Sequence, residues 1–301
     1  MEEPGEELID LNENNIKEKE NKSKKEEKNK KKDNNKFIYI LLLIIIAIII
    51  FLIYLYVNKQ IKYKSVIIFD FDKTIIEKDA FEEQRYILPS KEEQDEYVRR
   101  MYSNENWALV MSDYYNQFYN LNVTISEINN YIDKVEYTPG MIDLFHFLKK
   151  KEDKDILIII SAGHSYQIER ILQRNNLTSF FDEIIAFNSY IKDGKIIVNQ
   201  SNEYKCDVCL EIGICKTNEF NILKEKYKEK NIIFDKIFYI CDGVNDYCLA
   251  KNLEKNDELL IRKDHGLDKY LYKEGFVKNI KSNIYKWNSG FDIIKYFNNL
   301  K

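Results

Sequence analysis

Beyond residue 65, short apolar runs alternate with longer stretches in which apolar positions recur at helical spacing. Such alternation is typical of β-α units that build a parallel sheet. The apolar runs predict strands at 65–69, 156–160, 184–187, 236–240 and 258–261. The stretches between them predict helices at 141–151, 164–175, 216–230 and 245–254. The pattern therefore predicts an α/β fold with a parallel sheet.

The segment 78–138 contains helical patterns but no convincing strand. Thr124 and Glu127 have the spacing of a capping box, which opens a helix, and the last helical pattern ends before Thr138-Pro139-Gly140. We therefore expect a helical insertion after the first strand, with the aromatic-rich stretch 107–119 in its core. The segment 191–196 contains an Asp-Gly pair between apolar residues, which predicts a β-hairpin.

The first 57 residues differ in character from the rest of the chain. Residues 1–36 combine ten Lys and eleven acidic residues with no aromatic residue, which predicts a disordered tail. Residues 37–57 are 21 uncharged, almost entirely apolar residues, long enough for a helix to span a ~30 Å hydrocarbon layer. A core helix would carry a polar stripe, and a signal peptide would have a shorter apolar region followed by small residues. We expect a single transmembrane helix over 37–57 and a juxtamembrane linker over 58–64.

Positive charge beside this helix predicts its orientation. Ten Lys lie in residues 17–36, whereas four lie in residues 58–77. Because the more basic flank usually stays in the cytosol, we expect a cytosolic N-terminus and a luminal or extracellular folded domain.

Composition narrows the classes of function. Of the 301 residues, 45% are hydrophobic, which is enough for a real core, and the net charge is only −4, with 46 basic against 50 acidic residues. The basic residues are interspersed with acidic ones through most of the chain, so nucleic acid is not the expected partner. Five cysteines are too few for a disulfide scaffold of this size.

Candidate chemistry lies where the predicted strands end, because ligands of open parallel sheets gather at the carboxyl ends of the strands. The first strand is followed by Asp70-Phe71-Asp72-Lys73-Thr74, which places two carboxylates on one side of an extended segment. Two carboxylates at this spacing suit a nucleophile and a general acid/base that flank one phosphoryl group, with Mg²⁺ neutralising charge. The alternative is a turn-forming Asp pair, since Asp-x-Asp alone is a weak motif.

Two further strand ends carry polar groups. The second run ends in Ser161-Ala162-Gly163-His164, where small residues let an anion approach a hydroxyl and the N–H groups of a helix N-terminus. Asp242, Asn245 and Asp246 follow the third run and offer the hard oxygen ligands that Mg²⁺ requires. Lys216, at the start of an amphipathic segment, is the best-placed cation for a phosphate. Each motif is weak alone, but three such strand ends in this order together indicate phosphoryl chemistry.

With these motifs the chain resembles phosphatases of the haloacid dehalogenase superfamily over roughly residues 65–301. Within that superfamily it is most similar to the phosphoethanolamine/phosphocholine phosphatase and pyridoxal-phosphate phosphatase family. The resemblance rests on Asp70-Phe-Asp72-Lys-Thr74, Cys206-x-x-Cys209 followed by Cys215-Lys216, Tyr239-Ile-Cys-Asp242-Gly-Val-Asn245-Asp246, Arg262-Lys-Asp-His265-Gly266 and Trp287.

The resemblance implies a Rossmann-like core with a helical cap over about 78–138. It also implies an aspartyl-phosphate intermediate on Asp70, with Asp72 as general acid/base. The expected phosphate-binding residues are Ser161, Gly163 and Lys216. The expected Mg²⁺ ligands are Asp70, Asp72 through its backbone carbonyl, and Asp242, supported by Asn245 and Asp246. The expected activity is that of a membrane-anchored phosphomonoesterase acting on a small phosphorylated metabolite.

The departures from the family pattern concern the substrate. Family members carry Ser-Asp-Ala-Asn or Ser-Asp-Ser-Asn where this chain has the 161–164 motif, so a carboxylate expected near a cationic head group is absent. Glu77 and Asp79 align with the family's Asp and Asn after the first motif, and we expect them to contribute to substrate recognition. His164 is a further candidate substrate contact. Cys241 replaces the usual Gly before Asp242 and is tolerable if its side chain faces the core.

The cysteines form a cluster next to Lys216. Cys206, Cys209 and Cys215 lie within ten residues of one another. A structural zinc site needs four ligands, and the three histidines are remote in sequence. If the domain is luminal, a Cys206–Cys209 or Cys209–Cys215 disulfide is the alternative, and free thiols are the remaining one.

Two other functions fit the sequence. One is a degenerate phosphatase fold that binds partners without turnover, but intact Asp70, Asp72, Lys216 and Asp242 favour catalysis. The other is a phosphoprotein phosphatase of the same superfamily. The helical cap argues against it, because a cap closes the site over a small substrate, whereas a protein loop needs an open cleft.

Overall fold

The computed structural model describes residues 36, 38–56, 61–103, 105–151, 155–199, 206, 208 and 213–300. The chain divides into two compact units, Met1–Ile61 and Lys62–Lys301. Almost all of the predicted tail lies outside the described residues.

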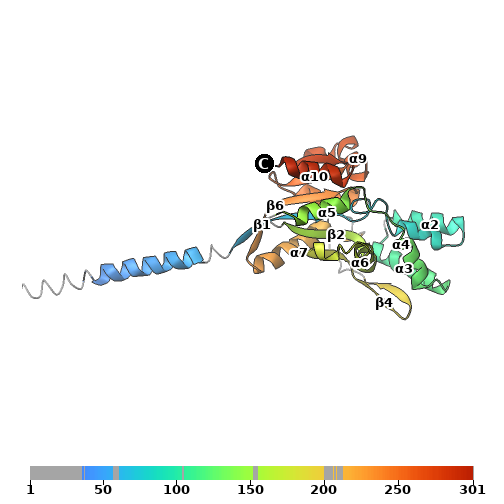
Figure 1. Cartoon of the computed structure of the whole chain (residues 1–301), viewed down its shortest axis with the longest axis horizontal. Coiled ribbons are helices and arrows are strands. Elements are labelled where there is room, and N and C mark those ends of the chain that lie inside the picture. Colours follow the sequence, from blue (N-terminus) through green and yellow to red (C-terminus); the bar gives the residue numbers. More distant parts are fainter. Residues whose placement is uncertain are drawn as a thin grey trace, which may run out of the picture. The chain divides into compact units, whose positions relative to one another are not determined.

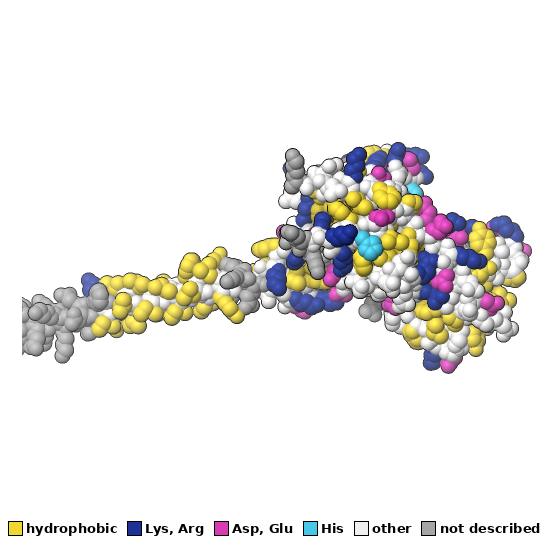
Figure 2. Space-filling model, viewed as in Figure 1, with side chains coloured by type: hydrophobic (Ala, Val, Ile, Leu, Met, Phe, Trp, Pro, Cys, Tyr) yellow, Lys and Arg dark blue, Asp and Glu magenta, His cyan; other side chains and the backbone are white. Residues whose placement is uncertain are grey.

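The described part of the first unit is an apolar helix, Ile38–Tyr56, which by length and composition is a candidate membrane span. Its side chains are exposed throughout, and hydrophobic groups cover its visible face (Figure 2).

The second unit is built on a six-stranded parallel sheet with strand order β3-β2-β1-β6-β7-β8. The strands are β1 (Lys62–Phe69), β2 (Ile156–His164), β3 (Glu183–Phe187), β6 (Ile232–Cys241), β7 (Glu258–Arg262) and β8 (Asn283–Trp287). The chain moves from β1 to one side through β2 and β3, then returns to the other side through β6. The carboxyl end of β1 therefore lies at the point where the strand order reverses, which is where such sheets bind ligands.

Apolar side chains of the central strands explain why the sheet forms here. Val66–Phe69 of β1 and Leu157–Ile160 of β2 are buried, as expected for strands covered on both faces. The Phe69 ring packs edge-on against Phe145, with a centroid distance of 5.4 Å, and against Phe181, at 6.1 Å.

Helices connect the strands and cover the sheet. They are α5 (Met141–Lys149), α6 (Ser165–Gln173), α7 (Lys216–Glu229), α8 (Tyr247–Asn252), α9 (Gly266–Lys273) and α10 (Gly290–Asn299), with short 3₁₀ turns η2 (Thr178–Phe180), η3 (Val244–Asp246) and η4 (Phe276–Asn279). In Figure 1, α5 and α10 lie together on one side of the strands and α7 on the other. A Cβ on Gly290 would lie 2.2 Å from the Gly140 carbonyl oxygen, so the close approach of α10 to the start of α5 requires glycine.

The segment between β1 and β2 is helical, as predicted, and forms the cap. Its elements are η1 (Glu82–Ile87), α2 (Lys91–Met101), α3 (Trp107–Asn120) and α4 (Ile125–Ile132). The three α-helices lie together beyond one end of the sheet (Figure 1). The predicted capping box of Thr124 and Glu127 opens α4. Aromatic side chains of α3 pack with Phe81 and Tyr97 in the cap interior, which confirms the predicted core role of 107–119.

The predicted hairpin is confirmed as the antiparallel pair β4 (Ser189–Lys192) and β5 (Lys195–Val198). Asp193 and Gly194 join the strands with positive φ angles of 50° and 77°, which suits a tight hairpin turn. The hairpin packs on the cap, where Ser112 of α3 donates a hydrogen bond to the Val198 carbonyl (3.1 Å).

The structure extends the sheet beyond the sequence prediction in three places. Lys62–Lys64, expected in the linker, begin β1 because they pair with Ile232–Phe234 of β6. β2 continues through the 161–164 motif, although its pairing with β3 is irregular after Ile160. β8 was not predicted, because its half-buried, mixed polar sequence carries no apolar run.

Candidate active site

Asp70 and Asp72 follow the central strand of the sheet. The Asp70 amide donates to the Ile240 carbonyl (2.9 Å), so the pairing with β6 continues one residue beyond β1. The chain then turns, and the Phe71 carbonyl accepts a hydrogen bond from the Ile75 amide (2.8 Å). Asp70 and Asp72 line the same cavity. The sequence therefore presents both carboxyl groups to one space, as their spacing predicts.

Lys216 begins α7, and its side chain is completely buried. Its Nζ forms ion pairs with Oδ1 of Asp70 and with Oδ1 of Asp246. Tyr239 donates its hydroxyl hydrogen to the same Asp246 oxygen (2.5 Å), and the Gly243 amide donates to the other (2.8 Å). Burial alone lowers the pKa of Lys216, but Asp246 and Asp70 outweigh it and raise the pKa above its usual value. Asp246 thus holds a charged ammonium group beside Asp70.

Asp242 follows β6 and lines the same cavity. Its carbonyl accepts a hydrogen bond from the Leu267 amide (2.7 Å), which fixes the turn after β6 against the start of α9. One carboxylate oxygen lies 3.5 Å from Thr74 Oγ1, and the other lies 3.3 Å from His265 Nδ1. These contacts orient the Asp242 carboxylate toward the end of β1.

Ser161 and Gly163 lie at the end of β2. The Gly163 amide donates a hydrogen bond to Ser161 Oγ (3.0 Å). A Cβ on Gly163 would lie 3.2 Å from Ser161 Oγ and 3.4 Å from Asp72 Oδ2. The missing side chain therefore keeps open a space bordered by the Ser161 hydroxyl and the Asp72 carboxyl group.

Asp70, Asp72, Gly163 and Asp242 border one cavity of about 770 Å³. The sheet side contributes five residues that were predicted as site residues: Asp70, Asp72, Gly163, Asp242 and Asn245. The cap contributes mainly large side chains around one carboxylate: Asp79, Phe81, Met101, Tyr102 and Trp107. Ser161, Lys216 and Asp246 are buried and do not line the cavity. The cavity therefore has a carboxylate-rich end and a largely aromatic wall.

Burial makes the two catalytic candidates harder to ionise. Burial and the neighbouring carboxylate of Asp246 raise the pKa of Asp70 well above its usual value, and Lys216 opposes this shift. Burial and the Asp79 carboxylate raise the pKa of Asp72 in the same way. The shift favours the protonated form of Asp72, which is the form that a general acid needs.

The donor set fits Mg²⁺. One carboxylate oxygen from each of Asp70, Asp242 and Asp246 lies within 4.8 Å of the other two. This buried cluster of described residues sets three carboxylates against the single ammonium group of Lys216. A divalent cation with oxygen ligands would balance the remaining negative charge.

Comparison with known proteins identifies the family. A family model described as "Putative Phosphatase" matches residues 65–300, which is most of the chain. The chain belongs to this phosphatase family. It is an enzyme of the haloacid dehalogenase superfamily, as the three motifs indicate.

Relatives cover nearly the whole folded domain of this phosphatase. Pyridoxal phosphate phosphatase PHOSPHO2 of Homo sapiens is 29% identical over 238 residues, which cover 77% of this chain and 97% of that protein. The phosphoethanolamine/phosphocholine phosphatase of Gallus gallus is 24% identical over 241 residues, covering 79% and 89%. A solved phosphoserine phosphatase, a phospho-aspartyl intermediate analogue, has a TM-score of 0.50 at 16% identity and covers 78% of this chain and 99% of its own. That structural likeness supports the fold.

Glu77, expected at the substrate of this phosphatase, does not line the cavity. Arg262 Nη2 donates to both Glu77 carboxylate oxygens (2.8 and 2.7 Å), and Arg262 Nη1 donates to the Lys73 carbonyl (2.6 Å). Glu77 thus ties the end of β7 to the turn that follows Asp72. The structure thus places Glu77 in an ion pair beside the site, and its contact with the substrate stays a prediction.

His164 is also removed from the cavity. Its ring is completely buried, with Nε2 2.7 Å from the Tyr115 hydroxyl and Nδ1 3.0 Å from Ser189 Oγ. Burial lowers the pKa of His164 to about 3, so the ring is neutral. The structure places this histidine at the contact between cap and core and not in the wall of the cavity.

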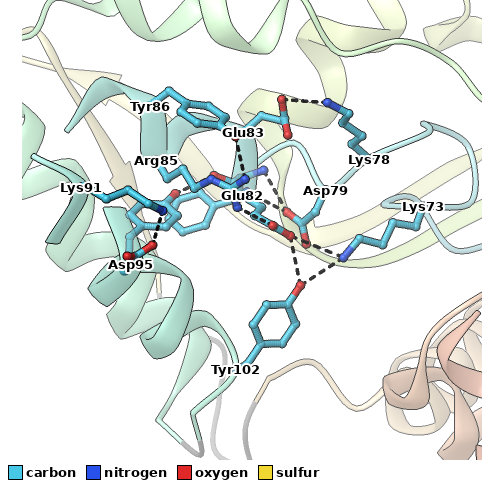
Figure 3. A network of polar contacts seen from close by, with 12 residues as sticks. Lys73, Lys78, Asp79, Glu82, Glu83, Arg85, Tyr86, Lys91, Asp95 and Tyr102 are labelled. Carbon is cyan, nitrogen blue, oxygen red and sulfur yellow. Dashed lines mark hydrogen bonds and ion pairs between the residues drawn. The ribbon is translucent and has the colours of Figure 1, made fainter. Parts of the chain in front are cut away.

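Asp79 does line the cavity, at the start of the cap. Its Oδ1 accepts hydrogen bonds from the amides of Phe81 and Glu82, both at 3.0 Å. Figure 3 shows it beside Lys73, whose Nζ lies 3.2 Å from the Tyr102 hydroxyl and 3.6 Å from Glu82 Oε2. The turn after β1, which carries Lys73, therefore contacts the cap directly beside Asp79.

Sequence reasoning missed several residues that support the site. Tyr239 lies in a predicted strand and begins one of the motifs that carry the family resemblance, but its position does not reveal the hydrogen bond to Asp246. Thr74 and His265 contact Asp242, and both lie in motifs that carried the family resemblance, which was the available signal.

The cysteines divide between described and undescribed positions. Cys241 is completely buried in the hydrophobic core, so its side chain does not lie in the cavity. Cys215 is buried just before Lys216, whereas Cys209 lies outside the described residues. A zinc site or a disulfide in this cluster remains a prediction.

Proposed function

We propose that this phosphatase hydrolyses a small phosphate monoester through an aspartyl-phosphate on Asp70. The observation that carries the proposal is the ion pair between the buried Lys216 ammonium group and Asp70. Asp70 lines one cavity together with Asp72 and Asp242. This arrangement brings a nucleophile and a proton donor to one cavity, with a cation in contact with the nucleophile.

In the first step, a carboxylate oxygen of Asp70 attacks phosphorus and the bond to the leaving oxygen breaks. Asp72 transfers its proton to that oxygen, so the leaving group departs as a neutral alcohol. Lys216, Ser161 and the amide groups around Gly163 stabilise the charge on the other phosphoryl oxygens.

In the second step, Asp72, now a carboxylate, accepts a proton from water that attacks the aspartyl-phosphate. The P–O bond to Asp70 breaks, and inorganic phosphate leaves. The cap supplies Phe81, Met101 and Trp107 to the wall of the cavity, which limits access of bulk water to the intermediate.

Asp70, Asp242 and the backbone carbonyl of Asp72 are the proposed ligands of Mg²⁺. Bound there, the ion neutralises negative charge on the phosphoryl group. Without it, the nucleophile approaches a dianionic phosphate across a cluster that already holds excess carboxylate.

The substrate is a small phosphate whose non-phosphate part carries an amine or an aromatic ring. The relatives named for pyridoxal phosphate and for phosphoethanolamine/phosphocholine support this class. Asp79 supplies a carboxylate for a cationic group, while Phe81 and Trp107 supply aromatic surface in the same cavity.

The apolar helix Ile38–Tyr56 anchors the enzyme in a membrane, with the phosphatase domain on the luminal or extracellular side. Support comes from the length and composition of the helix and from the ten Lys that precede it.

The test is a screen of the purified full chain in detergent against a panel of phosphomonoesters, with Mg²⁺ or with excess chelator. We expect Mg²⁺-dependent phosphate release, strongest with amine-bearing or aromatic esters. Full activity in excess chelator would exclude the metal role. Absence of turnover on the whole panel would favour a binding module that retains the fold.

A further inference from the structure

A continuous chain of buried hydrogen bonds runs between the core and the cap. It begins at Ser189 of β4, whose Oγ lies 3.0 Å from His164 Nδ1. His164 Nε2 lies 2.7 Å from the hydroxyl of Tyr115 on α3. That hydroxyl donates to Gln84 Oε1 (3.0 Å), and Gln84 Nε2 donates to the Ala80 carbonyl (3.2 Å). The cap residues Gln84 and Tyr115 are thus bonded to each other and to the core.

The chain ends at the proposed general acid/base. The Ala80 amide donates to Asp72 Oδ1 (2.9 Å), so one edge of the Asp72 carboxyl group is held by the peptide next to the Gln84-bonded carbonyl. The other oxygen, Oδ2, borders the open space at Gly163. The direction in which Asp72 presents its proton therefore depends on where Ala80 is held.

The donor in each of these hydrogen bonds follows from the protons that each side chain carries. Gln84 Oε1 can only accept, so the single hydroxyl proton of Tyr115 lies toward Gln84. The Tyr115 oxygen then accepts from His164 Nε2–H, and His164 Nδ1 accepts from the Ser189 hydroxyl. This pattern requires a neutral ring, which agrees with the burial of His164. A chain with every proton assigned holds its members in one orientation.

We propose that Tyr115 is a positioning residue for catalysis. Its hydroxyl holds Gln84 and, through it, the Ala80 peptide, and so orients Asp72 toward the leaving oxygen. This alignment depends on the contact between the cap and His164. The inference rests on the proposed function, in which Asp72 gives its proton to the leaving oxygen as Asp70 forms its bond to phosphorus. Tyr115 does not line the cavity, and its ring packs against Phe81 with or without the hydroxyl, so the hydroxyl acts on the reaction through this chain.

The test measures the hydrolysis of two phosphate esters by the wild type and by Tyr115→Phe, a variant that lacks only the hydroxyl. An alkyl phosphate needs its leaving oxygen protonated, whereas 4-nitrophenyl phosphate releases an anion that is stable without a proton. The parameter kcat/KM reports phosphoryl transfer to Asp70, before the intermediate is hydrolysed. In the full chain with Mg²⁺, we expect kcat/KM to fall about 10-fold for the alkyl ester and less than about 2-fold for 4-nitrophenyl phosphate.

A second variant breaks the next link. Gln84→Met keeps the side-chain volume but removes every hydrogen bond of the Gln84 side chain, those with Tyr115 and the Ala80 carbonyl and a third to Gln167 Oε1 (2.7 Å), and we expect the same dependence on the leaving group. The double variant should lose no more than Gln84→Met alone, because both substitutions break one chain. Tyr137→Phe is the matched control, since its hydroxyl donates to the Ile171 carbonyl (2.6 Å) outside this chain, and both esters should change less than about 2-fold.

Equal losses with both esters would overturn the inference, because they would show that Tyr115 only supports the folded cap. Unchanged kcat/KM with both esters in Tyr115→Phe would overturn it as well. If the wild-type chain hydrolyses neither ester, the proposed function fails first, and that outcome is distinct from a wild-type enzyme whose variants show no dependence on the leaving group.

Discussion

Arg262 binds Glu77 with both carboxylate oxygens engaged by one guanidinium nitrogen, at 2.8 and 2.7 Å, although the two residues are 185 positions apart. Arg262 is only 5% exposed, so Glu77 supplies the negative partner that its buried guanidinium group needs. Arg262 also donates a hydrogen bond to the Lys73 carbonyl, so the pair lies next to the turn that carries Asp72. The contact indicates that Glu77 supports the turn after β1.

Glu77→Gln should therefore affect stability and leave substrate binding unchanged. We expect a loss of about 1–2 kcal/mol in the free energy of unfolding, because a buried guanidinium loses its charged partner, and KM within about 2-fold of wild type. Denaturant titration and steady-state kinetics measure the two quantities. Glu254→Gln, which removes the exposed pair with Lys281, is the control and should cost under about 0.5 kcal/mol. A KM rise specific to amine-bearing substrates would return Glu77 to the substrate site.

Asp70→Asn should abolish turnover with the fold intact, because it removes the nucleophile but keeps its shape. We expect at least a ~10³-fold loss of kcat, measured as phosphate release, with an unchanged circular dichroism spectrum. Asp72→Asn should slow both chemical steps by about 10²–10⁴-fold, as general acid/base catalysis contributes typically that much. Near wild-type activity in Asp70→Asn would show that another group attacks phosphorus.

Asp79→Asn tests recognition of a cationic substrate. Because Asp79 is the carboxylate that the cap contributes to the cavity, we expect KM to rise about 10-fold for an amine-bearing phosphate and under about 2-fold for a neutral ester of similar size. Parallel kinetics with the two esters provide the measurement. Equal effects on both would assign Asp79 to its bonds with the Phe81 and Glu82 amides, which cap the start of η1.

His164 should make the folded domain sensitive to acid. Burial lowers its pKa to about 3 from the ordinary 6.5, so the unfolded chain binds a proton in this range that the folded domain excludes. Above pH 6.5 neither state binds this proton, so the free energy of unfolding is at its full value. As the pH falls from 6.5 toward 3, protonation of the unfolded chain lowers that free energy. The loss amounts to about 2 kcal/mol at pH 5 relative to pH 8.

Denaturant titrations of the wild type and His164→Gln at pH 5 and pH 8 check this prediction. The change in unfolding free energy between the two pH values should be about 2 kcal/mol smaller in the variant, since glutamine does not titrate. His146→Gln, at an exposed site, is the control and should behave as the wild type. An identical pH dependence in His164→Gln would mean that the ring takes up its proton in the folded state.

The proposed orientation can be tested with sealed microsomes. Residues 65–301 should resist protease added from the cytosolic side, while the N-terminal tail is cut. The sequons at Asn122 and Asn176 offer a second readout, since both asparagines are exposed and are glycosylated only in a lumen that holds the transferase. Digestion of the folded domain with a protected tail would reverse the orientation and leave the anchor in place.

Local pattern alone determined the parts of this protein that depend on neighbours in sequence. Apolar runs located most of the sheet, and the Asp70-x-Asp72 spacing directed both carboxyl groups to one side of the chain after β1. The capping box at Thr124 and the Asp-Gly turn at Asp193 were also readable, because each depends on residues within a few positions of one another.

Only the tertiary structure decided which polar groups meet. Glu77 and Asp79 lie two residues apart and look alike in sequence, yet one pairs with Arg262 from β7 and the other lines the cavity. His164 directly follows Ser161 and Gly163, the predicted phosphate contacts, but the packing of α3 buries its ring against Tyr115. The charge, partners and accessibility of a side chain depend on groups brought close by folding from distant positions, and hydrophobic periodicity carries no record of those groups.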